Sequence, residues 1–503
     1  MNINLNTKRY LLFVVALTLL YGVCFVFADF YGMPCSGIRD FLVLAAQWGV
    51  VTVASGAMLW LLSSWRWLFA VSFPLLTLLC TVLAYFRLTV KVALTPMIID
   101  LAMVNDLRTD LDVVSWQLIV FCLLSLSVSA WTVWWRWRRV RLRRPWLHAL
   151  IALMLVVAMN NVGAFAHPIA SRIPYNIYYA VTEYLDDHSI AQEHRPFFAG
   201  KAMCSDDSLT VVFVLGESLR AQNMQINGYQ RATTPLLCRE KNVVSLPQVW
   251  SEYCFTHQSV PYLLTRADHQ HPDRAYTERS LISLLRQAGY HTTWIANQES
   301  VPTFIYMMKE CDTLIYANGG KSLYVFDRWL DGDMLPHFDR ELRRPQQRLF
   351  VLLHSIGSHW WYNSHYDRAL WSPVIRSRVI SRNTHDEMVN SYDNTIAYSD
   401  RFWHALINRL RHRRAILIYL SDHAECLGED GLYTHGSDHP VLHRPGCFVW
   451  FSDSYAQRYP QRVEALRLNS GRTFNSSFLF HSLLDAASVK SPYINRKENI
   501  FAR

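Results

Sequence analysis

The chain has 503 residues, of which 51% are hydrophobic, and 49 Lys and Arg against 40 Asp and Glu give a formal net charge of +9. Its 18 Trp, 25 Tyr and 25 Phe exclude a disordered chain, and a mean hydropathy of +0.05 is too low for a protein that lies wholly in a membrane. These averages suit a membrane part joined to a water-soluble part, and the basic balance first suggests nucleic acid or a membrane surface as partner.

Five stretches without Asp, Glu, Lys or Arg occupy the first third of the chain. Each is 19 to 27 residues long, and they cover residues 10–28, 41–65, 67–86, 113–135 and 145–171. Because a helix needs about 20 residues to cross a bilayer core, we expect a transmembrane domain of five helices over residues 1–171. The fifth stretch is the weakest, since Asn160, Asn161 and His167 dilute its second half. A buried soluble core is the competing interpretation, and a signal peptide would explain the first stretch alone.

Basic segments set the expected orientation of these helices. Lys8 and Arg9 precede the first helix, and the loop before the fifth carries six Arg between Arg136 and Arg144 with no acidic residue. Five spans place both segments on one side of the membrane, which their positive charge makes the cytoplasmic side. The N-terminus is then cytoplasmic and everything after the fifth helix is outside. This membrane domain carries +7 of the net charge, so the basic balance is mostly a topology signal and not a sign of nucleic acid.

The outer part is divided into a membrane-proximal connector, residues 172–205, and a domain over residues 206–503. In that domain a helical segment near 276–288 alternates with short apolar runs, which are LTVVFVLG, YHTTWIAN, RLFVLLHS, RAILIYLSD and CFVWFSD. Runs of this length bounded by turn residues are typical of buried parallel strands. Their alternation with amphipathic stretches indicates an α/β domain with a mostly parallel central sheet and helices on both faces.

Polar residues of metal-binding type follow three of these runs. They are Glu217 and Ser218 after the first run, His354 and His359 after RLFVLL, and Asp422, His423 and His435 after ILIYLS. In open α/β sheets, ligand-binding residues gather at the carboxyl ends of the strands. Carboxylate and imidazole ligands suit Zn²⁺ best and Mn²⁺ less well. The pattern therefore predicts a metal site, against the alternative that these histidines are surface residues.

A hydrolase or transferase of this layout would use a hydroxyl group that the metal activates. The segment EYCFTHQSVPYLLTR offers Thr256, Ser259 and Cys254 as candidate nucleophiles. Local chemistry does not rank the three.

The sequence resembles the phosphoethanolamine transferases, membrane-anchored members of the alkaline phosphatase/sulfatase superfamily that include lipid A-modifying and colistin-resistance enzymes. The resemblance runs along the whole chain and rests on five motifs. They are GESLRAQNMQINGYQRATTPLL, the SVP at 259–261, H-x-x-G-S-H at 354–359, NSYDNTIAYSD at 390–400 and the block from Asp422 to His435. It implies an N-terminal five-helix transmembrane bundle followed by a periplasmic catalytic α/β domain of the alkaline phosphatase/sulfatase type, in a multi-pass protein of the bacterial inner membrane.

The resemblance also implies roles for single residues. Thr256, counted back from the SVP, falls on the catalytic nucleophile, and His354 would assist proton transfer. One Zn²⁺, with a second ion left open, would be bound by Glu217, Thr256, Asp422 and His423. The substrate-binding positions would be His359, His435, Asn297 and Gln298.

The activity that the resemblance implies is transfer of phosphoethanolamine from phosphatidylethanolamine to an envelope glycan, lipid A or another lipopolysaccharide group. The zinc-activated Thr256 would form a covalent phospho-threonine intermediate and release diacylglycerol. The expected partners are the lipid donor, the glycan acceptor and the bilayer, with no nucleic acid, and the expected state is a monomer.

Some positions depart from the family pattern. His257 stands directly after the nucleophile, as an extra base or as a bystander. The Lys usual a few residues after Asn297 and Gln298 is absent. Trp360 and Trp361 stand where Gly-Pro is usual. Where the family has S-D-H-G-E-S, this sequence has Ala424 in place of the Gly and Cys426 in place of the second Ser.

Rival interpretations concern both the chemistry and the disulfides. A phosphoglycerol transferase or phosphodiesterase would use the same scaffold, whereas a sulfatase needs a C-x-P-x-R or S-x-P-x-R motif that the sequence lacks. A non-catalytic membrane assembly protein would be expected to lose the metal ligands. Six cysteines lie in the outer part, where disulfides can form. We consider a Cys238–Cys254 pair and six free, buried thiols equally compatible with the sequence.

Overall fold

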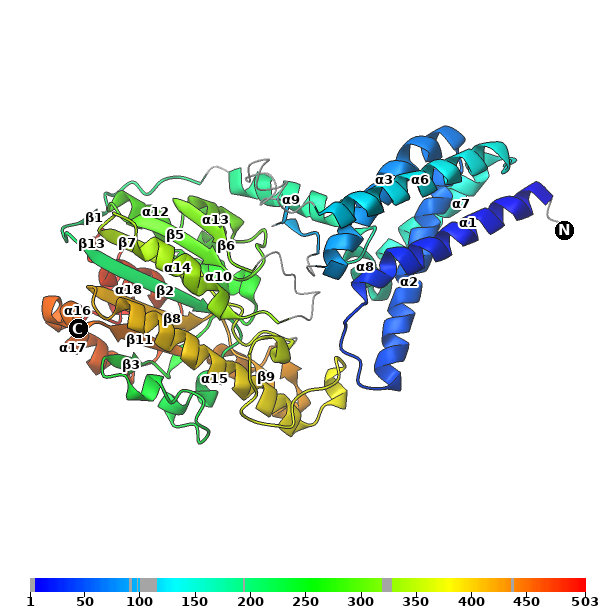
Figure 1. Ribbon diagram of the computed structural model, residues 1–503. Helices are drawn as coiled ribbons and strands as arrows, with labels where there is room; N and C mark the ends of the chain where they lie inside the picture. Colours follow the sequence, from blue (N-terminus) through cyan, green and yellow to red (C-terminus); the bar gives the residue numbers. More distant parts are fainter. Residues whose placement is uncertain are drawn as a thin grey trace. The chain divides into compact units, whose positions relative to one another are not determined.

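The structure of the protein, a computed structural model, forms two compact units, and the boundary between them falls after Leu185 (Figure 1). The described residues are 5–89, 93–96, 98–99, 115–192, 195–318, 328–435 and 438–503. The boundary lies within α9 (Asn176–Gln192), inside the connector that the sequence predicts.

The first unit consists of helices. Its long helices are α1 (Leu5–Cys24), α2 (Ile38–Ser63), α3 (Arg66–Thr89), α6 (Trp116–Arg138) and α7 (Pro145–Asn161), and the shorter η1 (Val26–Asp29) and α8 (Gly163–Ala170) extend α1 and α7. Four candidate membrane spans are found among the described residues, or five if α7 and α8, bent by 96°, are counted as one span. The bend follows Asn161, in the part of the fifth stretch that polar residues dilute.

Some polar side chains inside the helical unit are paired with partners on neighbouring helices. The Tyr10 hydroxyl lies 3.0 Å from Ser63 Oγ, and Arg136 donates to the Ser63 carbonyl at 3.0 and 2.8 Å. The buried ion pair between Arg87 and Asp29 spans 3.3 Å. Because hydrocarbon offers no hydrogen-bonding partner, such contacts are what allow polar groups in a membrane bundle.

The second unit is built on a seven-stranded sheet in the order β3-β11-β8-β2-β7-β5-β6 (Figure 1). Its strands are β2 (Leu209–Gly216), β3 (Val243–Ser245), β5 (His291–Ala296), β6 (Thr313–Tyr316), β7 (Arg348–His354), β8 (Ala415–Ser421) and β11 (Cys447–Phe451). The five strands from β8 to β6 are parallel, whereas β11 runs antiparallel to both β8 and β3. The sheet is therefore mixed.

The CFVWFSD run is the point at which the expectation of a parallel strand fails. It forms β11, which is antiparallel to β8. Between β8 and β11 the described chain contains the short β9 (Cys426–Leu427), β10 (Tyr433–Thr434), η8 (Glu429–Gly431) and η9 (Pro440–His443), and no α-helix. A parallel return needs a crossover connection, usually helical, so the chain comes back in the opposite direction.

Helices cover both faces of the sheet. One face packs against α10 (Thr256–Leu264), α12 (Leu281–Gln287), α13 (Ile305–Glu310), α16 (Asp453–Arg458), α17 (Pro460–Asn469) and α18 (Phe478–Ala486) in the main apolar core. The other face carries α14 (Leu335–Leu342) and α15 (His385–Leu410). On that side the ring of Trp403 of α15 packs at a steep angle against those of Tyr419 and Phe448, with ring centroids 4.5 and 5.0 Å away. The predicted helix near 276–288 is α12, preceded by the short α11 (Arg274–Thr277).

The register of the parallel strands determines where their loops meet. Gly216 at the end of β2 lies opposite Ser421 of β8, and Leu215 lies opposite His354 of β7. Because the carboxyl ends of these strands are level, the residues that follow them lie together at one edge of the sheet.

The ten cysteines are all free thiols in the structure. The considered pair between Cys238 and Cys254 is therefore not formed, since Cys238 is exposed and Cys254 is buried. Sequence separation alone does not show which side of the fold a thiol faces, so this pairing was beyond the reach of the sequence.

The N-terminus of α15 carries a capping box that generates a stability prediction. Thr384 Oγ1 accepts from the Glu387 amide at 3.2 Å, and the Glu387 carboxylate accepts from the Thr384 amide at 2.8 Å. We expect Thr384→Ala to lower the free energy of unfolding of the second unit by about 1 kcal/mol, measured by thermal unfolding of the full chain in detergent. The control Gln461→Ala, at an exposed position of α17, should leave the midpoint unchanged; equal midpoints for both variants would contradict the capping role.

Candidate functional site

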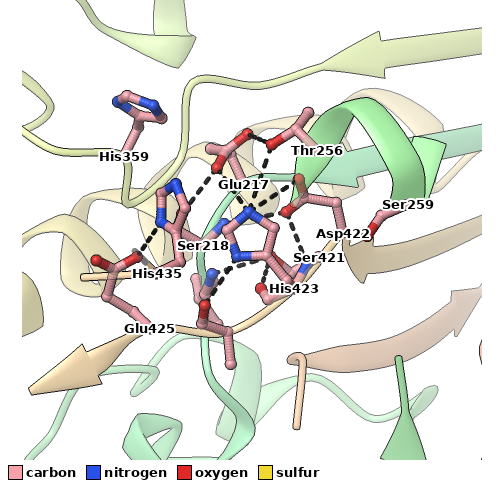
Figure 2. Close-up of polar contacts among 12 residues, drawn as sticks. Glu217, Ser218, Thr256, Ser259, His359, Ser421, Asp422, His423, Glu425 and His435 are labelled. Atoms are coloured by element: carbon pink, nitrogen blue, oxygen red, sulfur yellow. Dashed lines mark hydrogen bonds and ion pairs between the residues drawn. The ribbon is translucent and has the colours of Figure 1, made fainter. Parts of the chain in front are cut away.

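The centre of the site is formed by two carboxylates and one imidazole from neighbouring strands (Figure 2). Glu217 follows β2, and Asp422 and His423 follow β8. All three side chains are buried, and one ligand atom from each lies within 4.8 Å of the others. The parallel register of β2 and β8 thus brings together residues that are about 200 positions apart in the sequence.

Asp422 and Glu217 are held by donors from the chain that surrounds them. Asp422 Oδ1 accepts from the Ser218 amide at 3.2 Å and from the His423 amide at 2.8 Å. The Ser218 hydroxyl donates to Glu217 Oε1 at 2.7 Å, and Ser218 itself has φ of 55°. The second oxygen of Asp422 is buried with no hydrogen-bond partner among the described residues, which leaves it available as a ligand.

The proton of His423 is placed by its backbone neighbour. Its Nδ1 lies 2.8 Å from the Ala424 carbonyl, and since a carbonyl only accepts, Nδ1 carries the proton. The lone pair of Nε2 then faces Thr256 Oγ1 at 3.4 Å, Asp422 Oδ2 at 3.4 Å and Glu217 Oε1 at 3.5 Å. An imidazole that donates from one ring nitrogen to a backbone carbonyl and presents the lone pair of the other nitrogen is typical of a metal-binding histidine.

The electrostatics of the cluster favour a cation. Burial, with the nearby Glu217 carboxylate, raises the pKa of Asp422 well above its usual value. Burial also lowers the pKa of His423 to about 4, so its imidazole is neutral at pH 7. Two carboxylates this close and this dry repel each other unless a positive charge lies between them. The donor set of two carboxylates, an imidazole and a nearby hydroxyl fits Zn²⁺.

Of the three candidate nucleophiles, the structure brings Thr256 to this cluster. Thr256 is the first residue of α10, and its hydroxyl donates to Glu217 Oε2 at 3.1 Å (Figure 2). The Ser259 hydroxyl instead donates to the Tyr253 carbonyl at 3.2 Å. Cys254 lies in a small apolar cluster with Cys426. His257 is exposed, with its ring against that of Phe255.

His359 and His435 border the cluster. The His435 ring lies 4.5 Å from the His423 ring and 6.0 Å from the His359 ring, measured between centroids. His435 Nδ1 lies 3.1 Å from Glu425 Oε2. Burial lowers the pKa of His435, but the hydrogen bond and charge of Glu425 outweigh it and raise that pKa to about 9. Its positive charge at neutral pH makes this position suitable for an anion.

Gln298 and Asn297 make contacts that the sequence did not predict. The Gln298 amide donates to Glu217 Oε2 at 3.0 Å and to the Ser355 carbonyl at 2.7 Å, so it holds the carboxylate in place. Asn297 is fully buried, donates to Asp331 at 2.9 Å and accepts from Trp329 at 3.1 Å. These contacts support the shape of the site, and the predicted substrate role of both residues stays a prediction.

His354 lies at the end of β7, packed against aromatic rings. The ring centroids of Trp294 and Phe304 are 5.8 and 5.6 Å from its own. Neither ring nitrogen has a hydrogen-bond partner among the described residues, and burial lowers the pKa of His354 to about 4. A neutral imidazole in this position can take up a proton, but the hydrogen bonds of Thr256 described above do not include it.

Two further residues shape the site, and sequence reasoning assigned them no role. Gly357 has φ of +51°, and a Cβ there would lie 2.7 Å from the Glu217 carbonyl oxygen, so a larger residue would displace that carbonyl. The Tyr392 hydroxyl donates to the Ser218 carbonyl at 2.6 Å and accepts from the Arg220 amide at 2.9 Å. In the sequence, these two residues could have been recognised as the Gly of H-x-x-G-S-H and the Tyr of NSYDNT.

Comparison with known proteins gives two matching family models and several curated relatives. Residues 209–489 match the Sulfatase family model, and residues 52–173 match the model described as "Phosphoethanolamine transferase EptA/EptB". The Escherichia coli (strain K12) protein named "Kdo(2)-lipid A phosphoethanolamine 7''-transferase" is 31% identical over 301 residues, which are 57% of this chain and 51% of that protein. The chain thus spans about half the length of the first curated relatives that it matches.

Two solved structures share the fold. The integral membrane lipooligosaccharide phosphoethanolamine transferase A from Neisseria meningitidis has a TM-score of 0.56 and 20% identity, with 97% of each chain covered. The C-terminal periplasmic domain of Escherichia coli EptC, solved in complex with Zn, has a TM-score of 0.55 and 22% identity and covers 61% of this chain and 90% of that one.

The cluster generates a prediction on metal content. We expect Glu217→Gln to lower the zinc bound to the purified full-length protein by about one equivalent, because a neutral amide no longer offsets the charge of the cation. Elemental analysis of protein dialysed against dilute zinc measures the change. The matched control is Glu464→Gln, whose side chain is 58% exposed and which should keep the wild-type content. Unchanged zinc in the Glu217 variant would remove that residue from the metal site.

Proposed function

Since the chain belongs to the Sulfatase family over residues 209–489 and matches the phosphoethanolamine transferase EptA/EptB model over residues 52–173, we propose that it transfers phosphoethanolamine from phosphatidylethanolamine to an envelope glycan. Lipid A or another lipopolysaccharide group is the acceptor that we favour. The observation that carries this proposal is the Thr256 hydroxyl, which lies within reach of Glu217 and His423. A hydroxyl so placed is suited to serve as a nucleophile toward phosphorus.

In the first step, Thr256 Oγ attacks the phosphorus of the donor. The P–O bond to diacylglycerol breaks, phosphoethanolamine is bonded to Thr256, and the proton that the Thr256 hydroxyl loses is balanced by the one that the departing diacylglycerol oxygen takes up. Glu217 Oε2, which accepts the hydrogen bond of that hydroxyl at 3.1 Å, orients the Thr256 oxygen. A Zn²⁺ bound by Glu217, Asp422, His423 and Thr256 would lower the pKa of the hydroxyl and stabilise charge on the phosphate. In the second step, a phosphate or hydroxyl oxygen of the acceptor attacks the phospho-threonine and frees Thr256.

The histidines around the cluster take the remaining tasks. His435, positively charged beside Glu425, and the adjacent His359 would hold the phosphate oxygens of the donor. His354 would assist proton transfer, because its imidazole is neutral and its ring nitrogens lack partners among the described residues.

The membrane unit fits a lipid donor. Its candidate spans would hold the protein in the bacterial inner membrane with a cytoplasmic N-terminus and the second unit in the periplasm. The name of the Escherichia coli relative specifies lipid A, and the EptC domain was solved with Zn; both support the acceptor and metal that we propose. We expect a monomer, with no nucleic acid partner.

The proposed nucleophile generates a prediction on activity. Thr256→Ala should lower transfer by about 10³-fold or more, since a group that forms the covalent intermediate has been removed. Phosphoethanolamine transfer to purified lipid A by the detergent-solubilised protein measures it, and bound zinc should fall little because three ligands remain. Ser259→Ala is the matched control, because that hydroxyl contacts a backbone carbonyl. Full activity of the Thr256 variant would reject the assigned nucleophile.

A second prediction concerns the transferred group and its acceptor. Mass spectrometry of lipid A and other envelope glycans should show the mass of one added phosphoethanolamine in cells that produce the wild-type chain. The same cells producing Thr256→Ala should lack that species. Added phosphoglycerol would replace the proposal with a phosphoglycerol transferase on the same scaffold. Lipid hydrolysis without any glycan product would indicate a phosphodiesterase, and no difference at all would favour a non-catalytic assembly protein.

A further inference from the structure

A second group of potential metal ligands lies outside the cluster around Glu217. It consists of Cys254, Asp438 and His443, and one ligand atom from each lies within 4.8 Å of the others. The three come from two separate segments. Cys254 lies just before α10, and the other two belong to the turn that contains η9 (Pro440–His443). None of them takes part in the proposed transfer reaction.

The imidazole of His443 is held in an orientation that suits a ligand. Its Nδ1 lies 2.7 Å from the Ser251 carbonyl, which can only accept, so Nδ1 carries the proton. Nε2 then faces Asp438, 2.8 Å from Oδ1. The ring lies flat on Trp250, with centroids 4.8 Å apart and planes 6° apart. As at His423, a carbonyl on one ring nitrogen leaves the other to face a carboxylate, which is the arrangement expected of a metal ligand.

The chemistry of the three side chains narrows the choice of metal. Cys254 is 6% exposed and offers sulfur, His443 offers nitrogen and Asp438 offers oxygen. A thiolate combined with an imidazole and a carboxylate favours Zn²⁺ over the hard cations Mg²⁺ and Ca²⁺. The Asp438 side chain is 80% exposed, so water can reach the group and fill a fourth position.

We propose that Cys254, Asp438 and His443 bind a Zn²⁺ at a site separate from the one that Glu217 helps to form. The metal joins the segment that carries Thr256, two residues after Cys254, to the η9 turn. Ser251 connects the two sites, because its carbonyl fixes His443 while its hydroxyl donates to the Asp422 carbonyl at 2.8 Å. The ion therefore holds in place the chain segments that carry the Thr256 hydroxyl and the Asp422 carboxylate. This site does not depend on the proposed transferase activity.

Cobalt substitution tests the proposal, because of the two metal sites proposed among the described residues this one alone contains sulfur. The full-length protein in detergent is stripped with a chelator and titrated with Co²⁺, and the sulfur-to-cobalt charge-transfer band is recorded in the near ultraviolet. The wild-type chain should develop the band. Cys254→Ser should abolish it, and His443→Gln should weaken it at sub-saturating Co²⁺. A wild-type protein without the band, or a Cys254→Ser protein that keeps it, would overturn the proposal.

Two matched variants separate this site from the other one. Cys238→Ser removes an exposed thiol elsewhere and should leave the band intact. Glu217→Gln should also keep the band while it loses about one equivalent of zinc, so failure of the proposed transferase site would not affect the result. Cys254→Ser combined with Glu217→Gln should lose a further equivalent. Peptide mapping without reductant gives an independent check, since a disulfide between Cys254 and its neighbour Cys426 would also overturn the proposal.

Discussion

The constraint on which the second unit depends is the placement of two buried carboxylates side by side. Glu217 and Asp422 face each other because β2 and β8 are adjacent, parallel and in register. Removing two like charges from water is costly, and their mutual repulsion adds to that cost. Hydrogen-bond donors held in place by the surrounding chain offset part of this cost. They are the backbone amides of Ser218 and His423, the Ser218 hydroxyl and the Gln298 side-chain amide. The cation that we propose between the carboxylates would offset their remaining repulsion.

Residues of the NSYDNTIAYSD and H-x-x-G-S-H motifs support this centre through contacts with the loop that carries Glu217. Tyr392 on α15 holds the backbone of Ser218 and Arg220, and Asp393 beside it accepts from Asn223, Tyr229 and Arg231 of the loop after β2. Through these contacts α15 fixes the loop that carries Glu217. Gly357 allows the loop after β7 to approach the Glu217 backbone closely. Ligand side chains that are already held rigidly before a metal ion binds lose less conformational entropy when it binds.

The sequence predicted most of the strands and the metal-type residues at their ends, because short apolar runs followed by polar residues are local features. It did not predict the bend after Asn161, since apolar composition fixes the length of a stretch and not the path of its backbone. It also assigned β11 to a parallel sheet, although the missing crossover helix decides its direction. It named Gln298 and Asn297 as substrate-binding residues but did not predict their contacts, which depend on side chains from distant parts of the chain.

By itself, the sequence determined the two-part organisation, the apolar spans, the positive loop and the set of residues able to bind a metal, since all of these follow from composition and local order. From local chemistry alone it left three nucleophiles open, and only the tertiary structure put Thr256 within hydrogen-bond distance of Glu217 while directing the Ser259 hydroxyl to a backbone carbonyl. The tertiary structure also brought Cys254 to Asp438 and His443. Both outcomes rest on strand register and loop path, because the spacing of residues along a chain does not fix the distance between side chains on different elements.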